Sequence, residues 1–477
     1  MMRYPLCVFA DWAAGTWHGI SAEKEIISLN GWHNDTRSIQ PGQGFVALRT
    51  EQRDGHRFLV AAQRAGAGAA IVEVPDPEVS IPQLCVADSL AALQAIAEKH
   101  RKNFEGNVIG ITGSFGKTST KDILAQLLGE DQTLKTSGNY NNSLGVPLTL
   151  SQLDLQQHAF AVIEAGINQL NDMDGLATML QPEMTIITGI GPSHLEKLGT
   201  LENIANEKIK LATMARAGDG PVLFPHDCWQ YPAFRKMASR AWVLCPGEKA
   251  GEPIRAKQLF YYNTTHQAGE GCRLELRSAA FGLQSFKIPL MSQGMVRNVC
   301  LAIIAAAQSG VASERIQDAL VQWQPSALRG ELCRAGDRIF YVDCYNANPA
   351  SMVEGFAAFS LLTDPRLPRL YVLGCMAELG SDSVDWHRKT GRELNLRPQD
   401  RVIIIGEHAT PFADGVVQAG NQPEQVDICT SLAEVKGVFD PFIGAVMLKG
   451  SRNYQLEQLI ADNREGPIAY LNEHSRC

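Results

Sequence analysis

The chain has 477 residues, which is enough for two or three domains of about 150 residues, each with its own core. Its 51 acidic and 43 basic residues give a net charge of -8, which argues against a general nucleic-acid-binding protein, although a local basic patch can still bind an anionic substrate. The 11 cysteines lack a CxxC pair, and neither a signal peptide nor an apolar run of about 18 residues is evident, so we expect free thiols, no membrane span and a cytoplasmic location.

Residues 1–104 have the pattern of a small α/β domain. The stretches "GQGFVALRT" and "GAGAAIVEVPDP" are typical of strands. The stretch "DSLAALQAIAEKHRKN" is typical of an amphipathic helix that closes the unit.

Residues 105–325 alternate between strand and helix patterns. The expected strands are "NVIGIT", "HAFAVIEAG", "EMTIITGI" and "GPVLFP", and one of the helices between them is "TLENIANEKIKLATMARAG". This alternation predicts a parallel sheet with helical crossovers. Antiparallel strands are expected between about 255 and 290, followed by two closing helices and a boundary at Pro325.

Residues 326–477 restart the alternation. "RIFYVDC", "LYVLGC", "RVIIIGEH", "QVDICT" and "AVMLKGS" predict the strands of a second, Rossmann-like sheet. The chain as a whole is therefore predicted to be an α/β protein of three domains.

The stretch "VIGITGSFGKTSTKDILAQLLG" predicts a phosphate cradle made of a strand, a glycine loop and a helix. Backbone N–H groups and the helix N-terminus attract phosphate, Lys117 adds a cation, and the Thr118 hydroxyl can bind magnesium. Ile111 stands where the first glycine of the usual spacing belongs, so the motif is a variant, and a plain glycine turn is the alternative. The candidate nucleotide-binding residues here are Gly113, Ser114, Phe115, Gly116, Lys117, Thr118 and Ser119.

Several charged or amide side chains follow expected strands. Glu164 could reach a magnesium ion held at Thr118, or it could be an ordinary solvated carboxylate. His194 could bind a metal or simply cap its loop, and a helical lysine such as Lys208 is normally a solvated charge. Two asparagine-rich stretches and the basic strand end "KGSR" could bind a polar or anionic ligand or serve only turns and solvent. The candidates from these stretches are Asn142, Asn346, Asn348 and Lys449.

Taken in order, these stretches resemble the Mur ligase family, whose members join amino acids or dipeptides to UDP-N-acetylmuramoyl precursors of peptidoglycan. The matching elements are "DTRSIQPGQGFVAL", "DGHRF", "TGSFGKTS", "NYNNSLGVPLTL", "VIEAG", "GPSHLEKLGT", "ENIANEK", "YNANPASM", "MAELG" and "KGSR". The resemblance implies a nucleotide-sugar-binding domain, a central P-loop ATPase-like domain and a C-terminal domain that receives the incoming amine. It favours the member that adds D-alanyl-D-alanine to a UDP-N-acetylmuramoyl tripeptide through an acyl phosphate, with ATP and Mg²⁺ and as a monomer.

The resemblance also implies roles for individual residues. Thr118 and Glu164 would hold one magnesium ion, His194 a second, and Lys208 would be carbamylated to N6-carboxylysine and approach the metals. Asn298 would contact adenine, Asp343 the ribose, and Arg329 the nucleotide. Lys117, Glu164, His194 and Lys208 are the candidate catalytic residues, and Thr36, Arg37, Gly55 and His56 are the candidates for the nucleotide sugar.

Two other functions stay open. Positions that differ from the family pattern include Gly294, Cys344 and Cys375, so a Mur-like ligase for another carboxylate and amine is one alternative. The other is a non-catalytic nucleotide-binding protein. The complete set of phosphate and metal candidates argues against it.

Overall fold

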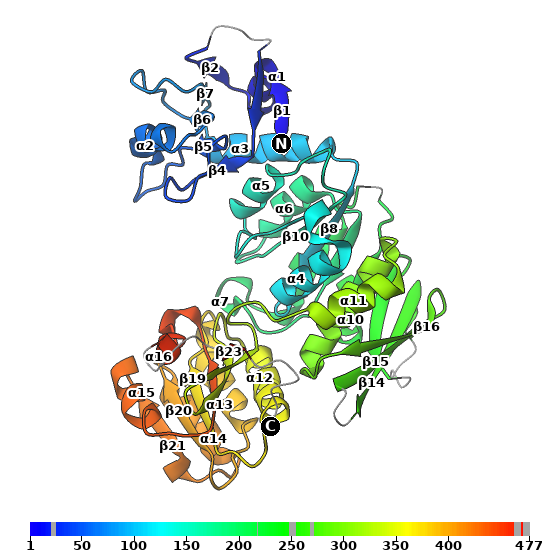
Figure 1. Cartoon of the computed structure of the whole chain (residues 1–477), viewed down its shortest axis with the longest axis vertical. Helices are drawn as coiled ribbons and strands as arrows, with labels where there is room; N and C mark the ends of the chain where they lie inside the picture. Colours follow the sequence, from blue (N-terminus) through cyan, green and yellow to red (C-terminus); the bar gives the residue numbers. More distant parts are fainter. Residues whose placement is uncertain (21–24, 217, 248–253, 268–270, 462–468, 471–477) are drawn as a thin grey trace.

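The computed structural model describes residues 1–20, 25–216, 218–247, 254–267, 271–461 and 469–470. Three large sheets, each formed by a different part of the chain, follow one another along the long axis of the molecule (Figure 1). The N-terminal unit (blue) lies at the top of the view, the central unit (cyan to green) lies below it, and the C-terminal unit (yellow to red) lies at the bottom. All cysteines among the described residues are free thiols.

The N-terminal unit is a small α/β structure with a five-stranded sheet in the order β2-β7-β6-β5-β4. Its elements are β1 (Met2–Pro5), α1 (Leu6–Ala13), β2 (Thr16–His18), β3 (Ile26–Leu29), β4 (Trp32–His33), β5 (Gly44–Val46), α2 (Leu59–Arg64), β6 (Ala69–Val72), β7 (Gln83–Cys85) and α3 (Ser89–Lys102). The predicted closing helix is α3, which begins where the Asp88 carboxylate accepts the Leu90 and Ala91 N–H groups. The buried Arg101 at its end bonds Glu183 and the Leu180 carbonyl, which fixes the unit to the central one.

The central unit has a nine-stranded sheet in the order β16-β15-β14-β13-β12-β11-β8-β10-β9. Its strands are β8 (Asn107–Thr112), β9 (Thr133–Lys135), β10 (Phe160–Glu164), β11 (Met184–Ile187), β12 (Val222–Pro225), β13 (Ala241–Pro246), β14 (Gln258–Gln267), β15 (Gly271–Ser278) and β16 (Gly282–Ile288). Its α-helices are α4 (Lys117–Leu128), α5 (Gly145–Leu150), α6 (Asp172–Leu180), α7 (Leu195–Leu198), α8 (Leu201–Ile209), α9 (Pro232–Arg235), α10 (Gln293–Gln308) and α11 (Ser313–Gln322). Strands β9 to β14 pair in parallel and β14-β15-β16 pair antiparallel, so the sheet is parallel with an antiparallel addition, as predicted.

The core of the central unit explains where its phosphate-loop helix lies. Ile123, Leu124, Leu127 and Leu128 share one face of α4, and all four are buried. They pack in one cluster with strands β8, β10 and β11 and with helix α10. The hydrophobic face of α4 therefore holds its polar N-terminus at the sheet edge.

The C-terminal unit has a seven-stranded sheet in the order β21-β20-β19-β22-β18-β17-β23. Its strands are β17 (Glu331–Ala335), β18 (Arg338–Asp343), β19 (Arg369–Gly374), β20 (Arg401–Ile405), β21 (Val426–Cys429), β22 (Ala445–Lys449) and β23 (Ala469–Tyr470). Its α-helices are α12 (Pro349–Leu362), α13 (Ser383–Arg392), α14 (Ala409–Gln418), α15 (Leu432–Phe439) and α16 (Gln458–Ala461). The five predicted strands are present and parallel, and the antiparallel β17 and β23, which the sequence patterns did not predict, extend one edge.

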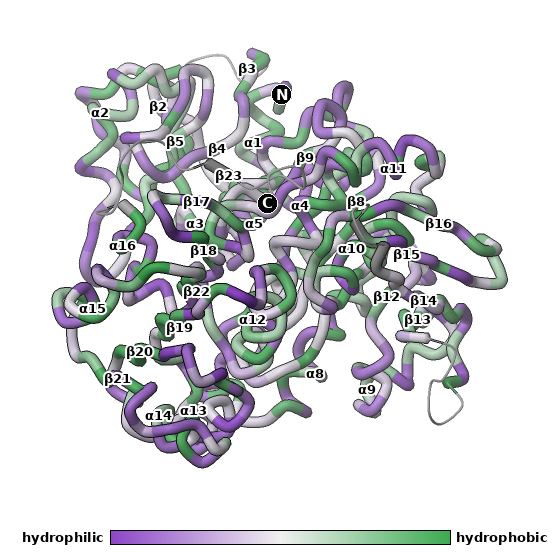
Figure 2. Tube along the Cα trace, turned by 60° about the horizontal axis from the view of Figure 1, so that its bottom comes forward, coloured by the Kyte–Doolittle hydropathy of each residue, from purple (hydrophilic) through white to green (hydrophobic). Residues whose placement is uncertain are grey.

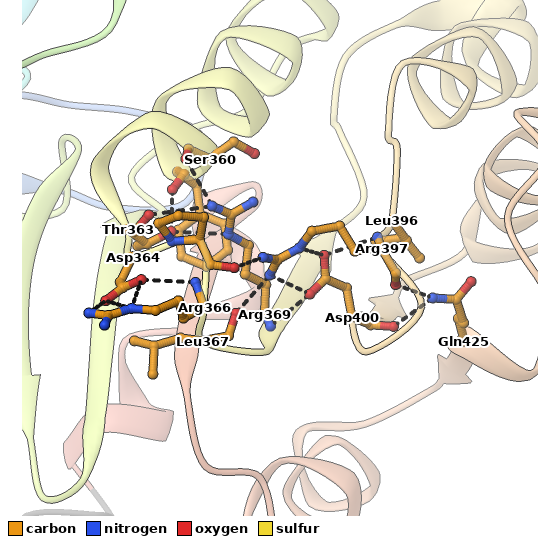
Figure 3. Close-up of polar contacts among 12 residues, drawn as sticks. Ser360, Thr363, Asp364, Arg366, Leu367, Arg369, Leu396, Arg397, Asp400 and Gln425 are labelled. Atoms are coloured by element: carbon orange, nitrogen blue, oxygen red, sulfur yellow. Dashed lines mark hydrogen bonds and ion pairs between the residues drawn. The ribbon is translucent and has the colours of Figure 1, made fainter.

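The amino ends of β19 and β20 are tied together by an ion-pair network (Figure 3). The buried Asp400 carboxylate accepts hydrogen bonds from the Arg397 guanidinium at 2.7 Å and 2.8 Å and from the Arg369 backbone N–H at 3.0 Å. The Arg369 side chain in turn donates to Thr363. Because these groups lie at the strand ends opposite to Asp343 and Lys449, the network stabilises the unit rather than the cleft described below.

No helix among the described residues is long and apolar enough to cross a membrane. Figure 2 shows hydrophilic and hydrophobic stretches interleaved along the chain.

Candidate active site

A cleft of about 360 Å³ lies where the central and C-terminal units meet. In the central sheet β8 lies between β10 and β11, and in the C-terminal sheet β22 lies between β18 and β19. Since the carboxyl ends of parallel strands lie at one edge of a sheet, the loops that follow them gather here. The predicted residues that line the cleft are Ser114, Phe115, Gly116, Lys117, Thr118, Ser119, Glu164, His194, Asn298, Arg329, Asp343, Asn346, Asn348 and Lys449.

The glycine loop between β8 and α4 needs glycine at two positions. Gly113 has φ +152°, and a Cβ there would lie 2.0 Å from Thr188 Oγ1. Gly116 has φ +75°, and a Cβ there would lie 2.6 Å from Asn298 Oδ1. Both the backbone conformation and the space therefore exclude larger residues, and the loop is held close to the side chains beneath it.

Lys117 is the cation of this loop. Its Nζ donates to the Gly113 carbonyl at 2.9 Å, so the side chain folds back over the loop. Burial lowers the pKa of Lys117, while the nearby Glu164 carboxylate opposes this shift. The ammonium group is thus placed where phosphate oxygens would meet it.

Glu164 is 2% exposed at the end of β10. Its Oε2 accepts from Thr118 Oγ1 at 3.0 Å, and its Oε1 accepts from Asn141 Nδ2 at 2.8 Å. A buried carboxylate beside a hydroxyl is a pair of hard oxygen donors, which suits Mg²⁺. Among the described residues no group of three or more His, Cys, Asp or Glu side chains could hold a metal alone, so phosphate oxygens would have to complete such a site.

His194 caps α7 with a left-handed backbone, φ +52°. Its Nδ1 contacts the carboxylate of Glu378 from the C-terminal unit. The hydrogen bond from His194 lowers the pKa of Glu378. Because Nδ1 is engaged with the carboxylate, Nε2 is the ring nitrogen left to bind a ligand.

Lys208 is buried at the end of α8, with 1% of its surface exposed. It is therefore not the solvated lysine that its helix pattern alone favours. Burial and the neighbouring Lys117 charge hold the pKa of Lys208 well below its usual value, and Glu164 acts in the opposite direction. Lys208 lies close enough to Lys117 and Glu164 to interact electrostatically but does not itself line the cleft.

The C-terminal unit contacts the glycine loop directly. Asn348 Nδ2 donates to the Ser114 carbonyl at 3.1 Å, and Arg329 Nη2 donates to Thr118 Oγ1 at 3.3 Å. The Arg329 guanidinium also lies 4.0 Å from the ring centre of Tyr345. The two units are therefore in direct contact beside the cleft.

Asp343 and Lys449, predicted to bind separate ligands, form an ion pair at the ends of β18 and β22. The Lys449 ammonium is fully buried and donates to Asp343 Oδ2 at 2.7 Å. Both residues line the cleft. Their predicted contacts with ribose and with substrate stay predictions.

Of the buried polar atoms at the cleft that have no hydrogen-bond partner among the described residues, two belong to residues predicted to bind the nucleotide. They are the Ser114 hydroxyl and the carbonyl oxygen of the Asn298 side chain. Both residues line the cleft, with exposures of 8% and 6%. Since buried polar groups are normally paired, these two atoms fit a cleft that is completed by a polar ligand.

Asn142 lies outside the cleft, although it was a candidate for substrate binding. Its Oδ1 accepts the Gly145 N–H at 2.8 Å at the start of α5, which is turn chemistry. The neighbouring Asn141 lines the cleft instead. A role for Asn142 in binding stays a prediction.

The four nucleotide-sugar candidates belong to the N-terminal unit and do not line this cleft. Arg37 is exposed and pairs with Asp35 at 2.6 Å. His56 Nε2 accepts the Glu73 N–H at 2.9 Å, and Gly55 leaves room for the Leu48 backbone. Thr36, which precedes Arg37, is half-buried.

The positions that depart from the family pattern have local reasons. A Cβ at Gly294 would lie 2.4 Å from Glu354 Oε2, which already accepts the Gly294 N–H at 2.8 Å. Cys344 and Cys375 are both buried, at 0% and 1% exposure. Glu354 thus contributes a carboxylate from α12 to the cleft where Gly294 has no side chain.

Sequence reasoning missed four residues that shape the site. Thr188 donates through Oγ1 to the Phe115 carbonyl, and Asn141 bonds Glu164. Glu378 contacts His194, and the buried His387 accepts the Met376 N–H at 2.9 Å, which fixes the segment before Glu378. Thr188 follows β11 directly, so its position after a predicted strand was the signal that could have identified it. The other three residues make contacts with segments that are not adjacent to them in the sequence, and no local pattern pointed to those contacts.

Comparisons with known proteins agree with this geometry. Residues 111–306 match the Mur ligase middle domain, and residues 328–439 match the Mur ligase, glutamate ligase domain. The chain is 29% identical to the UDP-N-acetylmuramoyl-tripeptide–D-alanyl-D-alanine ligase of Bacillus subtilis, over 98% of this chain and 100% of that protein. It is also 29% identical to the ligase of the same name from Escherichia coli, over 91% of this chain and 93% of that protein.

The fold comparison gives the same result. A crystal structure of MurF from Acinetobacter baumannii superposes with a TM-score of 0.81 at 27% identity, covering 98% of this chain and 100% of that one. The predicted α/β fold of three domains is therefore confirmed. The chain belongs to the Mur ligase family.

Proposed function

We propose that this chain is an ATP-dependent, ADP-forming ligase that adds D-alanyl-D-alanine to a UDP-N-acetylmuramoyl tripeptide. The three units, divided near residues 104 and 325, would bind the nucleotide sugar, ATP and the incoming dipeptide. The observation that carries the proposal is that residues of two units line one cleft. Lys117, Thr118 and Glu164 come from the central unit, and Arg329 and Lys449 come from the C-terminal unit.

The glycine loop supports binding of the ATP phosphates. Its N–H groups and the N-terminus of α4 attract anionic oxygens, and the folded-back Lys117 supplies a cation beside them. Arg329 adds a second cation from the other unit. Phosphoryl transfer spreads charge over the phosphate oxygens, so these positioned cations lower its barrier chiefly by electrostatic stabilisation.

The Thr118 hydroxyl and the Glu164 carboxylate would hold one Mg²⁺ and His194 Nε2 a second, with phosphate oxygens completing both sites. When bound, Mg²⁺ neutralises charge on the phosphates and on the carboxylate that attacks them. The chain's own contribution is orientation, because Asn141 holds Oε1 of Glu164 at 2.8 Å and so fixes the carboxylate plane.

Lys208 fits the predicted N6-carboxylysine. Its lowered pKa favours the neutral amine, which adds to CO2 with loss of one proton to give a carbamate. The product places an anion beside the Lys117 cation, where a protonated Lys208 would be a second buried cation. The change removes a repulsion and gives a longer side chain that can reach toward the metal sites.

The C-terminal unit would place the amine of the dipeptide. The substrate carboxylate attacks the γ-phosphate to give an acyl phosphate and ADP; the amine then attacks the acyl carbon, and phosphate leaves. Asn346, Asn348 and Lys449, whose ammonium pairs with Asp343, are among the residues of this unit that line the cleft. They would orient the dipeptide before attack.

The nucleotide sugar would bind the N-terminal unit near Thr36, Arg37, Gly55 and His56. A monomer is predicted, since one chain supplies residues from all three units.

The test is phosphate release and product mass for the full chain with ATP and Mg²⁺. UDP-N-acetylmuramoyl tripeptide and D-alanyl-D-alanine are supplied together and then each is omitted. Release that needs both, with a product heavier by the dipeptide less water, is the expected result.

Tight ATP binding without that product would refute the proposed acceptor or amine and favour a Mur-like ligase for other substrates. Absence of both ATP binding and phosphate release would favour a non-catalytic protein. A size measurement of the chain in solution tests the monomer.

A further inference from the structure

The loop that carries His194 and the loop that carries Glu378 form a close backbone contact between the central and C-terminal units. The Glu196 N–H donates to the Glu378 carbonyl at 3.4 Å. A Cβ at Gly380 would lie 3.1 Å from Glu196 Cα, so the two loops nearly touch. Leu195 packs against the cores of both units.

The two residues at the centre of this contact share an uncommon backbone conformation. His194 has φ +52° and Glu378 has φ +61°. A left-handed conformation costs about 1–2 kcal/mol for residues with a Cβ. Such conformations persist where the surrounding structure requires them, often at functional sites.

The conformations bring the two side chains together. His194 Nδ1 meets the Glu378 carboxylate, and because a carboxylate only accepts, the imidazole proton lies on Nδ1. In the neutral imidazole this tautomer leaves Nε2 as the acceptor, and the ring cannot turn without breaking the contact. Glu378 is 56% exposed, so hydrophobic packing does not explain its position.

A second buried histidine holds the Glu378 loop in place. His387 Nε2 accepts the Met376 N–H at 2.9 Å, and its Nδ1 bonds the Ser383 carbonyl at 2.7 Å. The segment that precedes Glu378 is thereby anchored to α13. The Glu378 carboxylate that contacts His194 therefore belongs to a loop that is held in place by hydrogen bonds within the C-terminal unit.

We propose that Glu378 is a positioning residue that fixes the tautomer and orientation of His194, so that the His194 metal site is complete only when the C-terminal unit is docked. Metal-binding histidines commonly donate their second ring N–H to a carboxylate, and loss of that partner weakens metal binding about 10- to 100-fold. Here the partner comes from another unit. The inference rests on the proposed role of His194 as a ligand for a second cation.

The test measures binding of Mn²⁺, as a substitute for Mg²⁺, to the full chain with a non-hydrolysable ATP analogue, by electron paramagnetic resonance. The variants are Glu378→Ala and Glu378→Gln. His194→Asn removes the proposed metal-binding side chain itself and so shows which Mn²⁺ ion is bound there. Glu424→Gln is the matched control, because it removes the same charge from an exposed position of the same unit.

We expect two Mn²⁺ ions in the wild type and the control. Glu378→Ala should weaken only the ion that His194→Asn removes, by at least about tenfold. Mn²⁺ binding should be weakened less by Glu378→Gln, because the amide oxygen of Gln can still accept a hydrogen bond from His194 Nδ1. Equal binding by Glu378→Ala and wild type, or equal weakening of both ions, would overturn the inference.

A second measurement does not depend on metal or activity. In metal-free protein labelled with [15N]histidine, with His194→Asn to assign the signal, the wild type should show the Nδ1–H tautomer and Glu378→Ala a mixture. An unchanged tautomer in Glu378→Ala contradicts the proposal. Absence of ligase product in the wild type with this tautomer intact would count against the proposed function alone.

Discussion

Thr188 offers a sharp test of how the glycine loop is held in shape. Its buried hydroxyl donates to the Phe115 carbonyl in the middle of the loop, and the Thr112 carbonyl lies 3.3 Å from the same oxygen. Thr188→Val keeps the volume and removes the only proton that this side chain can donate. The loop would then have to be ordered by the nucleotide on binding.

The size of the effect follows from that bond. Leaving a partly buried carbonyl without its donor costs about 1–2 kcal/mol, at the lower end of the range for buried groups because Phe115 is only partly covered. At 1.4 kcal/mol for each factor of ten, the Kd for an ATP analogue should rise about 5- to 30-fold. Isothermal titration calorimetry on the full chain measures this value.

The matched control is Thr185→Val. Thr185 lies in β11, three residues before Thr188. Thr185 is also buried, but its hydroxyl has no hydrogen-bond partner among the described residues, so the same substitution should leave nucleotide affinity unchanged. The reasoning is refuted if Thr188→Val binds the analogue within twofold of wild type, or if Thr185→Val is weakened as much.

Four further predictions follow from the site and its support. Lys117→Ala should reduce kcat at least about 100-fold through lost stabilisation of the phosphoryl group, and near-normal product formation would contradict its role. Lys208→Ala should be weakly active and partly rescued by a short carboxylic acid in the assay; no rescue by any such acid argues against carbamylation. Burial lowers the pKa of His387 from 6.5 to about 4. Below pH 6.5 the unfolded chain therefore takes up a proton that the folded chain does not. The free energy of unfolding should fall between pH 6.5 and 4 by at most about 3 kcal/mol. Thermal unfolding over this range should have a shallower pH slope in His387→Gln; equal slopes would exclude the effect. Asp400→Ala should lower stability by about 3–5 kcal/mol, because it removes the carboxylate partner of Arg397 and leaves the backbone N–H groups of Arg369 and Arg397 without their acceptor, while nucleotide affinity stays unchanged; lost affinity with an unchanged unfolding temperature would show that the network serves the cleft.

Local patterns predicted much of the fold. The strand β8, the loop 113–116 and the helix α4 were predictable because a buried strand, glycines with positive φ and an amphipathic helix are each encoded within a few residues. The five parallel strands of the C-terminal sheet were predicted for the same reason. Strands β17 and β23 were not, because β17 mixes polar and apolar residues over only five positions and β23 has only two residues, so neither has a strong apolar pattern.

The asparagine-rich stretch shows where local reasoning stops. "NYNNS" indicated either turn chemistry or ligand contact. Asn142 accepts the Gly145 N–H at the start of α5, whereas Asn141 bonds Glu164 and lines the cleft. Which neighbour does which depends on where β10 lies relative to the turn. That information is not present in the stretch itself.

The sequence by itself determined the parallel sheets, the phosphate-binding loop and the residue types available for catalysis, because these depend on short-range periodicity and on glycine conformations. Only the tertiary structure decided that Lys208 is buried beside Lys117 and Glu164, that Asp343 pairs with Lys449, and that Glu378 reaches His194. These contacts join residues that are 44 or more positions apart. Their formation depends on how sheets pack and how the C-terminal unit docks, and the free energy of those long-range contacts is not encoded in any local pattern.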